Sequence, residues 1–153
     1  MSTEPREDSA EGYRPVPVDD RLGLALTAAS RAMEARYRTS LARLQLTYSQ
    51  FQVMSVLWED GSHVVGTLAG RLALDISTIS PLLKRLESRG LVVRRRDERD
   101  ERRVVVTLTE RGLALRSEES AILEQVSVST HLSAAQERSL VQQLHRLARF
   151  LGS

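Results

Sequence analysis

The chain has 153 residues, of which 41% are hydrophobic and 27% charged, and these values suit one globular domain of ordinary size. It contains no cysteine, which excludes disulfides, thiolate metal sites, cysteine nucleophiles and thiol redox sensing. No apolar run approaches the roughly 20 residues that span a bilayer. The first 20 residues lack a signal-peptide pattern, so we expect a cytoplasmic protein without membrane contact.

Charge is unevenly distributed along a chain whose formal net charge is only +2. Residues 1–20 carry two arginines and six carboxylates, and the prolines within residues 1–18 favour a disordered acidic tail there. Residues 84–103 carry nine Lys/Arg against five Asp/Glu. A local basic cluster is typical of proteins that bind the phosphate backbone of nucleic acid, but most runs of charge are solvated faces. The position of the cluster in the fold therefore has to distinguish a binding surface from a solvated face.

Helical periodicity dominates the first part of the chain. Apolar residues three or four positions apart predict a long first helix that begins near Asp19 or Asp20. Its apolar stripe consists of Leu22, Leu26, Ala29, Met33, Tyr37, Leu41 and Leu44. Thr47 and Gln50 form the pattern T-x-x-Q, which predicts a capping box at the start of a second helix. The inward residues of that helix are Phe51, Met54, Leu57 and Trp58, and Asp60-Gly61 ends it.

Two further helices are predicted before the chain becomes extended. The third covers about 65–72. After a brief turn, Asp75 is a good N-cap for the fourth, which ends at Arg89 before the expected C-terminal glycine, Gly90.

A hairpin and two helices complete the pattern. Strands at 91–95 and 104–108 flank a charged tip. Thr109 with Glu110 opens a fifth helix to about Val128, and S-x-x-Q at Ser133 opens a sixth. The predicted order, α-α-α-α-β-β-α-α, is mainly α with a small β-hairpin wing, which is the winged helix-turn-helix fold. The terminal helices carry apolar stripes that need a packing partner.

The fourth helix is the most informative segment. At about 100° per residue, one side is apolar, formed by Ile79, Leu82, Leu83 and Leu86. The opposite side carries small hydroxyls and cations, formed by Ser77, Thr78, Ser80, Pro81, Lys84, Arg85 and Ser88. Such a low-profile polar face fits close approach to the major groove of DNA, and the plain alternative is a solvated surface helix.

The hairpin tip contains two D-x-R triplets, Asp97/Arg99 and Asp100/Arg102. We expect each carboxylate to hold the neighbouring guanidinium in one orientation. An oriented arginine on a thin hairpin can enter the narrow minor groove, where the potential is most negative. The alternative is an exposed network of ion pairs that contributes little to the stability of the fold.

The stretch L-A-L-D-I-S-T-I-S-P-L-L-K-R-L-E-S-R-G-L-V-V-R-R-R-D-E-R-D-E-R-R-V-V-V-T-L-T-E-R-G, from Leu72 to Gly112, resembles the MarR family of transcriptional regulators. The likeness extends over residues 19–153, with the winged helix at about 47–109 and dimerisation helices at about 19–45 and 109–151. It implies a homodimer that binds a pseudo-palindromic operator in double-stranded DNA, most often as a repressor. The implied DNA-contacting residues are Ser77, Thr78, Ser80, Lys84, Arg85, Arg99, Asp100 and Arg102, with Arg102 in the minor groove.

Within this family, L-T-Y-S-Q and R-D-E-R-D-E-R are similar to the organic-hydroperoxide-sensing, OhrR-type branch. That branch senses peroxide through a cysteine, whose position is Gly23 here, so a thiol sensor is excluded. Thr27 replaces one of the tyrosines that bond the cysteine, and Tyr37 keeps the other. The resemblance then implies a small apolar or phenolic effector. Tyr37, Met54 and Trp58 are candidate pocket residues, for which plain core packing is the favoured interpretation.

Three other classes of function remain as alternatives. The three histidines are scattered and no nucleophile elbow or phosphate-binding loop is present, so we expect neither an enzyme nor a cofactor. A metal-responsive regulator would have to use His131 or His145, although scattered histidines are more often surface residues. A winged helix used only for protein contacts would usually lack so basic a wing.

Overall fold

The computed structural model describes residues 15–152, so the tail predicted over residues 1–18 lies largely outside the described residues. The chain divides after Ala32 into two compact units. Helix α1 (Leu22–Leu41) crosses this division and follows a 3-10 turn, η1 (Val18–Asp20). The two aspartates therefore lie in the turn before the helix and not at its cap, which corrects the predicted start.

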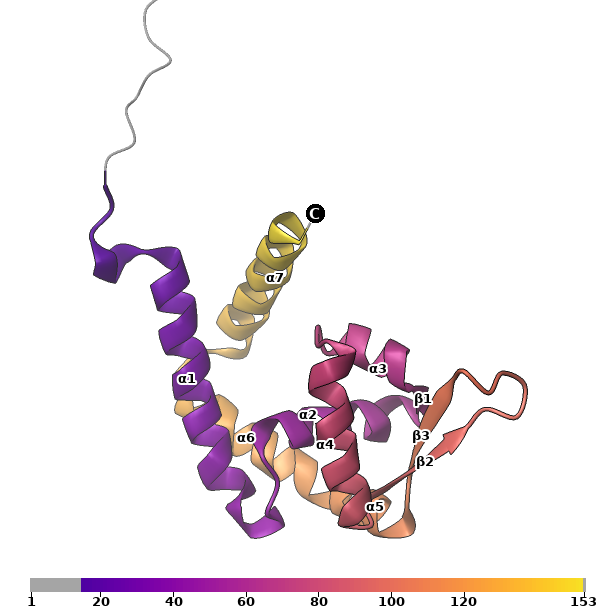
Figure 1. Cartoon of the computed structure of the whole chain (residues 1–153). Helices are drawn as coiled ribbons and strands as arrows, with labels where there is room; N and C mark the ends of the chain where they lie inside the picture. The colour runs from indigo at the N-terminus through magenta and orange to yellow at the C-terminus, as the bar shows by residue number, and fades with distance from the viewer. Residues whose placement is uncertain (1–14, 153) are drawn as a thin grey trace, which may run out of the picture. The chain divides into compact units, whose positions relative to one another are not determined.

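The second unit contains the expected winged helix. After the turn η2 (Ala42–Leu44), the elements in chain order are α2 (Tyr48–Asp60), β1 (His63–Val64), α3 (Val65–Arg71), α4 (Ile76–Ser88), β2 (Val92–Arg96), β3 (Val104–Leu108), α5 (Glu110–Ala114), η3 (Leu115–Glu118), α6 (Glu119–Ser129) and α7 (Ala134–Leu151). The β2–β3 hairpin projects from the helices α2, α3 and α4 as a wing (Figure 1).

Helix ends follow their sequence signals. The capping box of α2 is formed, since Gln50 N–H donates to Thr47 Oγ1 at 3.2 Å and Thr47 N–H donates to Gln50 Oε1 at 3.0 Å. The box at Ser133 is formed in the same way at the start of α7. Gly90 follows α4 with φ of 67°, a left-handed conformation that glycine adopts without a steric penalty.

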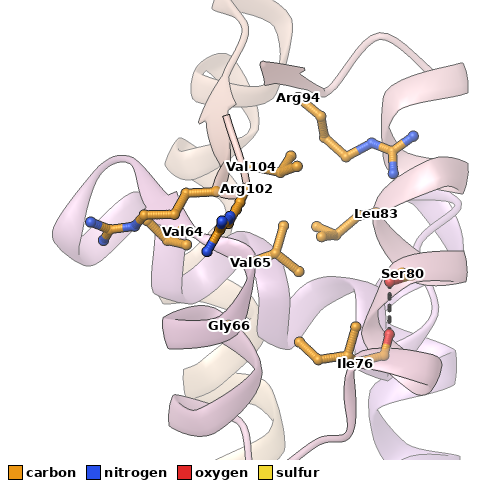
Figure 2. A pocket seen from close by; sticks show the side chains of 10 residues that line it. Val64, Val65, Gly66, Ile76, Ser80, Leu83, Arg94, Arg102 and Val104 are labelled. Carbon is orange, nitrogen blue, oxygen red and sulfur yellow. Dashed lines mark hydrogen bonds between the residues drawn. The ribbon is translucent and has the colours of Figure 1, made fainter. Parts of the chain in front are cut away.

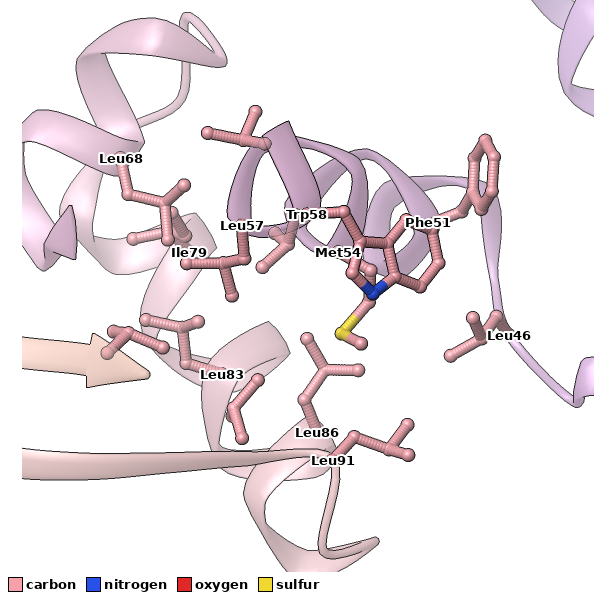
Figure 3. Close-up of a cluster of buried hydrophobic side chains, with 14 of the residues drawn as sticks. Leu46, Phe51, Met54, Leu57, Trp58, Leu68, Ile79, Leu83, Leu86 and Leu91 are labelled. Carbon is pink, nitrogen blue, oxygen red and sulfur yellow. The ribbon is translucent and has the colours of Figure 1, made fainter. Parts of the chain in front are cut away.

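The hydrophobic core lies between α2, α3, α4 and the sheet (Figure 3). Its fully buried side chains include Met54, Leu57, Leu68, Ile79, Leu83, Leu86, Leu91 and Val106. Each such side chain contributes about 1.5–3 kcal/mol relative to exposure. The core face predicted for α4 is confirmed. Because this face anchors α4, the opposite face of the same helix is left to solvent.

The sheet has one strand more than the sequence predicts. Its order is β1-β3-β2 and both pairs are antiparallel, with His63 opposite Val106 and Val92 opposite Leu108. Strand β1 has only two residues, so no period-2 pattern can be recognised in it. By pairing with β3, it ties the base of the wing to the start of α3.

The helix predicted from Thr109 to about residue 128 is not continuous. The structure has α5, the 3-10 turn η3 and then α6. Within η3 the hydroxyl of Ser117 donates to the carbonyl of Ala114 at 3.1 Å. Serine hydroxyls compete in this way with the bonds of a regular helix, and the apolar spacing of the segment carries no sign of the break.

Helix α7 leaves its apolar stripe exposed in the single chain. No residue of α7 is buried. Leu140, Val141 and Leu144 are 44%, 44% and 39% exposed. Leu144 follows Leu140 by four positions and Val141 by three, so the three side chains share one face. On α6, Leu123 and Val128 are also exposed.

Candidate nucleic-acid interface

The polar face of α4 is open to solvent. Ser77, Thr78, Lys84 and Arg85 are exposed, and Ser80 is half-buried. All five sequence-predicted residues of this helix therefore lie on the side away from the core residues Ile79, Leu83 and Leu86. This brings hydroxyls at the start of the helix and cations in its middle onto one surface.

Backbone groups add to this surface at the start of α4. Asp75 occupies the N-cap position but makes no side-chain cap bond, so its carboxylate does not accept from the first amides of the helix. Pro81 has no N–H, so the carbonyl of Ser77 lacks its usual helical donor. The N–H of Thr78 donates to the carbonyl of Asp75 at 3.0 Å, which leaves the amides of Ile76 and Ser77 at the helix start. Such amides attract anions such as phosphate, and they lie beside the exposed hydroxyls of Ser77 and Thr78.

The hydroxyl of Ser80 has a different capacity from those of its neighbours. Ser80 Oγ donates to the carbonyl of Ile76 at 2.7 Å. With its proton engaged, the oxygen is left as an acceptor. It is therefore suited to an amino group at the edge of adenine or cytosine and poorly suited to a phosphate oxygen.

The carboxylates of the wing tip hold the backbone and not the guanidinium groups. Asp97 Oδ1 accepts from the N–H of Arg99 at 2.9 Å, and Asp100 Oδ1 accepts from the N–H of Arg102 at 3.1 Å. This corrects the role expected for the D-x-R triplets, since a carboxylate two residues before an amide closes an Asx turn. In the described part of the chain, Arg99 and Arg102 form no ion pair, so both guanidinium groups remain available to an external anion.

A bidentate ion pair joins the wing to α4. Glu87 Oε2 accepts from Arg94 Nε at 2.9 Å and Nη2 at 2.7 Å, and Glu87 Oε1 accepts from Arg94 N–H at 2.9 Å. The side-chain hydrogen bond from Arg94, followed by the backbone one, lowers the pKa of Glu87. Sequence reasoning missed this pair, because a spacing of seven residues across a helix–strand corner has no recognisable pattern. It fixes the base of the wing against the helix.

A groove separates the wing from α4, as Figure 2 shows. Its volume is about 420 Å³. Apolar side chains form one part of the lining, namely Val64, Val65, Ile76, Leu83 and Val104, and Arg94, Arg102 and Arg103 form another. The hydroxyl face of α4 and the basic wing therefore border one hollow, which the sequence does not predict.

The three candidate effector residues have different environments. Met54 is fully buried, and Trp58, 3% exposed, donates its indole N–H to the carbonyl of Gly112 at 2.9 Å, so both belong to the core. Tyr37 is half-buried and stacks on Tyr48 with ring centroids 4.3 Å apart. Burial, with smaller contributions from Tyr48 and Glu137, raises the pKa of Tyr37 to about 12.

The described residues include no group of three or more His, Cys, Asp or Glu side chains that could hold a metal ion. Over the same part of the chain, no helix is both long and apolar enough to cross a bilayer.

Comparison with known proteins places the chain in a family. A family model described as transcriptional regulator SarA/Rot matches residues 36–118. The chain is 39% identical over 130 residues to the HTH-type transcriptional regulator TtmR of Methylorubrum extorquens (strain PA1), which covers 85% of this chain and 67% of that protein. It is 39% identical over 99 residues to the organic hydroperoxide resistance transcriptional regulator of Bacillus subtilis (strain 168), covering 65% of this chain and 67% of the relative.

Solved structures agree with this placement. The chain matches Bordetella bronchiseptica BpsR, a protein whose DNA binding is regulated by 6-hydroxynicotinic acid, with a TM-score of 0.79 and 28% identity. The match covers 88% of this chain and 98% of BpsR. The chain belongs to the MarR-type family of winged-helix transcriptional regulators, which includes SarA/Rot, and is a DNA-binding regulator of transcription.

Proposed function

We propose that the protein binds a pseudo-palindromic operator as a homodimer, with α4 in the major groove and the wing tip in the minor groove. The observation that carries this proposal concerns the guanidinium groups of Arg99 and Arg102, which form no ion pair with any described residue. The carboxylates of the tip bond the backbone amides instead. The α4 face that carries Ser77, Lys84 and Arg85 supplies the major-groove contacts. Of the wing residues, Arg102 enters the minor groove and Asp100 positions it through the turn.

The exposed stripe on α7 supports the homodimer. A single chain would leave Leu140, Val141 and Leu144 in water, together with Leu123 of α6. A second copy presents the same stripe, and a two-fold axis lets each cover the other. Two copies of α4 then read two half-sites about one helical turn apart.

Fluorescence anisotropy tests the DNA contacts. We expect a duplex from the region upstream of the protein's own gene to bind about a thousandfold more tightly than a scrambled duplex, and the affinity to fall steeply with salt. Arg102→Ala should weaken operator binding by about 1–3 kcal/mol, the scale of one specific contact. Arg116→Ala, an exposed arginine in η3 away from the wing, is the matched control. Wild-type affinity in Arg102→Ala would favour a winged helix that serves protein contacts.

We further propose that the protein represses transcription and that a small apolar or phenolic effector releases it. BpsR, whose DNA binding is regulated by 6-hydroxynicotinic acid, a hydroxylated aromatic acid, supports a small aromatic effector. Tyr37 is the candidate effector residue that retains partial exposure, whereas Met54 and Trp58 lie in the core. A screen of hydroxylated aromatic acids for loss of operator anisotropy tests this step. Adding zinc or a chelator to the same assay tests the metal-responsive alternative.

A further inference from the structure

Arg89 is a cation of the basic stretch 84–103 whose side chain is engaged inside the protein. It caps the C-terminal end of α4. Its Nη1 donates to the carbonyl of Gln45 at 2.6 Å, and its Nη2 donates to the carbonyl of Leu44 at 3.0 Å. Those carbonyls belong to the turn between α1 and α2, so one guanidinium spans 44 and 45 positions of sequence.

The turn that receives these bonds needs external donors. Leu44 ends the 3-10 turn η2, and the last carbonyls of a helical turn lack donors of their own. Gln45 adopts φ of 54°, a left-handed conformation that costs free energy for a side chain of this size. Leu46 follows immediately and is buried in the core. A guanidinium that donates to both carbonyls therefore holds the sharp turn between α1 and α2 in place.

The same contact brings together two helix ends of the same polarity. The carbonyl ends of η2 and α4 both carry partial negative charge, and a cation between them is favourable to each. Lys84 and Arg85, one turn earlier on α4, remain exposed. The basic stretch thus contains cations that face solvent, such as Lys84 and Arg85, and cations with partners in the protein. Arg94 pairs with Glu87, and Arg89 joins α4 to the turn after α1.

We propose that Arg89 is a positioning residue for DNA recognition that fixes the C-terminal end of α4 against the α1–α2 turn and makes no contact with DNA. This inference rests on the proposed function, since it concerns the angle at which α4 enters the major groove. Removal of the bridge lets α4 tilt, which weakens base contacts made by its first turns. The number of phosphates contacted stays the same, so the salt dependence of binding stays the same.

The salt dependence of operator binding separates a positioning cation from a phosphate-contacting one. Arg89→Met keeps most of the side-chain length and removes the donors, and Lys84→Met is the matched variant of an exposed cation on the same helix. For Arg89→Met we expect operator affinity to fall by about 2- to 30-fold, with unchanged affinity for scrambled duplex and an unchanged slope of log K against log salt. For Lys84→Met we expect weaker binding to both duplexes and a slope smaller by about one.

Arg89→Lys is the second variant, for the case that Arg89→Met does not fold. Its ammonium keeps the positive charge and can donate to one or both of the carbonyls. We expect it to fold and to recover part of the lost operator affinity at the wild-type slope. A slope reduced by about one in Arg89→Met would show a phosphate contact and overturn the proposal, as would wild-type operator affinity in a folded Arg89→Met. Failure of the wild-type chain to prefer any operator over scrambled DNA would instead refute the proposed function, and the positioning role with it.

Discussion

Gly112→Ala tests how tightly α5 packs against Leu91, in the turn between α4 and β2. A Cβ at Gly112 would lie 2.0 Å from the carbonyl oxygen of Leu91 and 3.0 Å from its carbon. That oxygen cannot move away freely, because it accepts from Thr109 N–H at 3.1 Å and from Thr109 Oγ1 at 3.2 Å. The helix must therefore retreat by roughly 1 Å in an interior that is close-packed.

The magnitude follows from three contributions. Overpacking of this kind costs about 1–3 kcal/mol. The retreat also stretches the bond from Trp58 Nε1 to the Gly112 carbonyl, which contributes about 0.5–1.5 kcal/mol. Alanine in a helix offsets about 0.5–1 kcal/mol by reducing the entropy of the unfolded chain. We expect a net destabilisation of about 0.5–4 kcal/mol, centred on about 2 kcal/mol, which at the centre is on the order of 4–8 °C in Tm for a chain of this length.

Urea and thermal unfolding at fixed protein concentration measure this effect, since association would otherwise shift the midpoint. Gly70→Ala in α3 is the matched control, because a Cβ there meets nothing within 4 Å. We expect the control to be stabilised by about 0.5–1 kcal/mol. Equal stability of Gly112→Ala and the wild-type chain, with the control behaving as expected, would refute the packing argument.

Three further predictions concern charge and assembly. Hydrogen bonds from Arg94 lower the pKa of Glu87 in the folded chain, so this ion pair stabilises the fold fully above the ordinary carboxyl pKa of 4.5. The stabilisation is lost as pH falls through the lowered pKa. In Glu87→Gln, the free energy of unfolding should therefore decrease less steeply at acid pH than in the wild-type chain. Burial raises the pKa of Tyr37 from 10.0 to about 12, so the neutral phenol favours the folded state most fully below pH 10 and this contribution is lost as pH rises towards 12. Burial also raises the pKa of Tyr48, so in an ultraviolet titration Tyr37→Phe should reduce the late phenolate step and leave the part that belongs to Tyr48. An unchanged late step would contradict the assignment to Tyr37. If the chain forms the proposed dimer, Leu144→Glu should sediment as a monomer at micromolar concentration, because it places a charge in the apolar stripe of α7. Gln143→Glu adds the same charge one residue away and should leave the proposed dimer intact. Monomers in both variants would show that the added charge, and not its place in the stripe, causes dissociation.

Local signals predicted most of the fold. Thr47 with Gln50, and Ser133 with Gln136, each contain both partners of a capping box within four residues, so the pattern specifies the bonds. The apolar spacing of Ile79, Leu83 and Leu86 specifies the buried face of α4 and, by exclusion, its solvent face. These features depend only on neighbours within a helical turn or two.

Features that depend on distant neighbours were missed or misjudged. In the sequence, Arg89 and Glu87 cannot be distinguished from the other charged residues of the stretch 84–103. Only the fold brings the Gln45 carbonyl next to Arg89 and the Arg94 side chain next to Glu87. At the wing tip, the D-x-R spacing predicts contacts between carboxylates and guanidinium groups, but the Asp100 carboxylate accepts from the backbone amide of Arg102 instead. Entropy favours that shorter connection, since a long side chain loses more freedom when it is held.

Trp58 gives the chain a built-in optical probe. It is the only tryptophan, its ring is almost fully buried, and its indole N–H bonds the Gly112 carbonyl, so it sits where α2 meets α5. Its fluorescence emission should therefore respond to unfolding of the winged helix and should not change when the exposed face of α7 is covered or uncovered. Dissociation of two intact subunits would leave the spectrum unchanged, whereas unfolding would expose the indole and shift its emission to the red. Assembly and folding can thus be followed separately without attaching a dye.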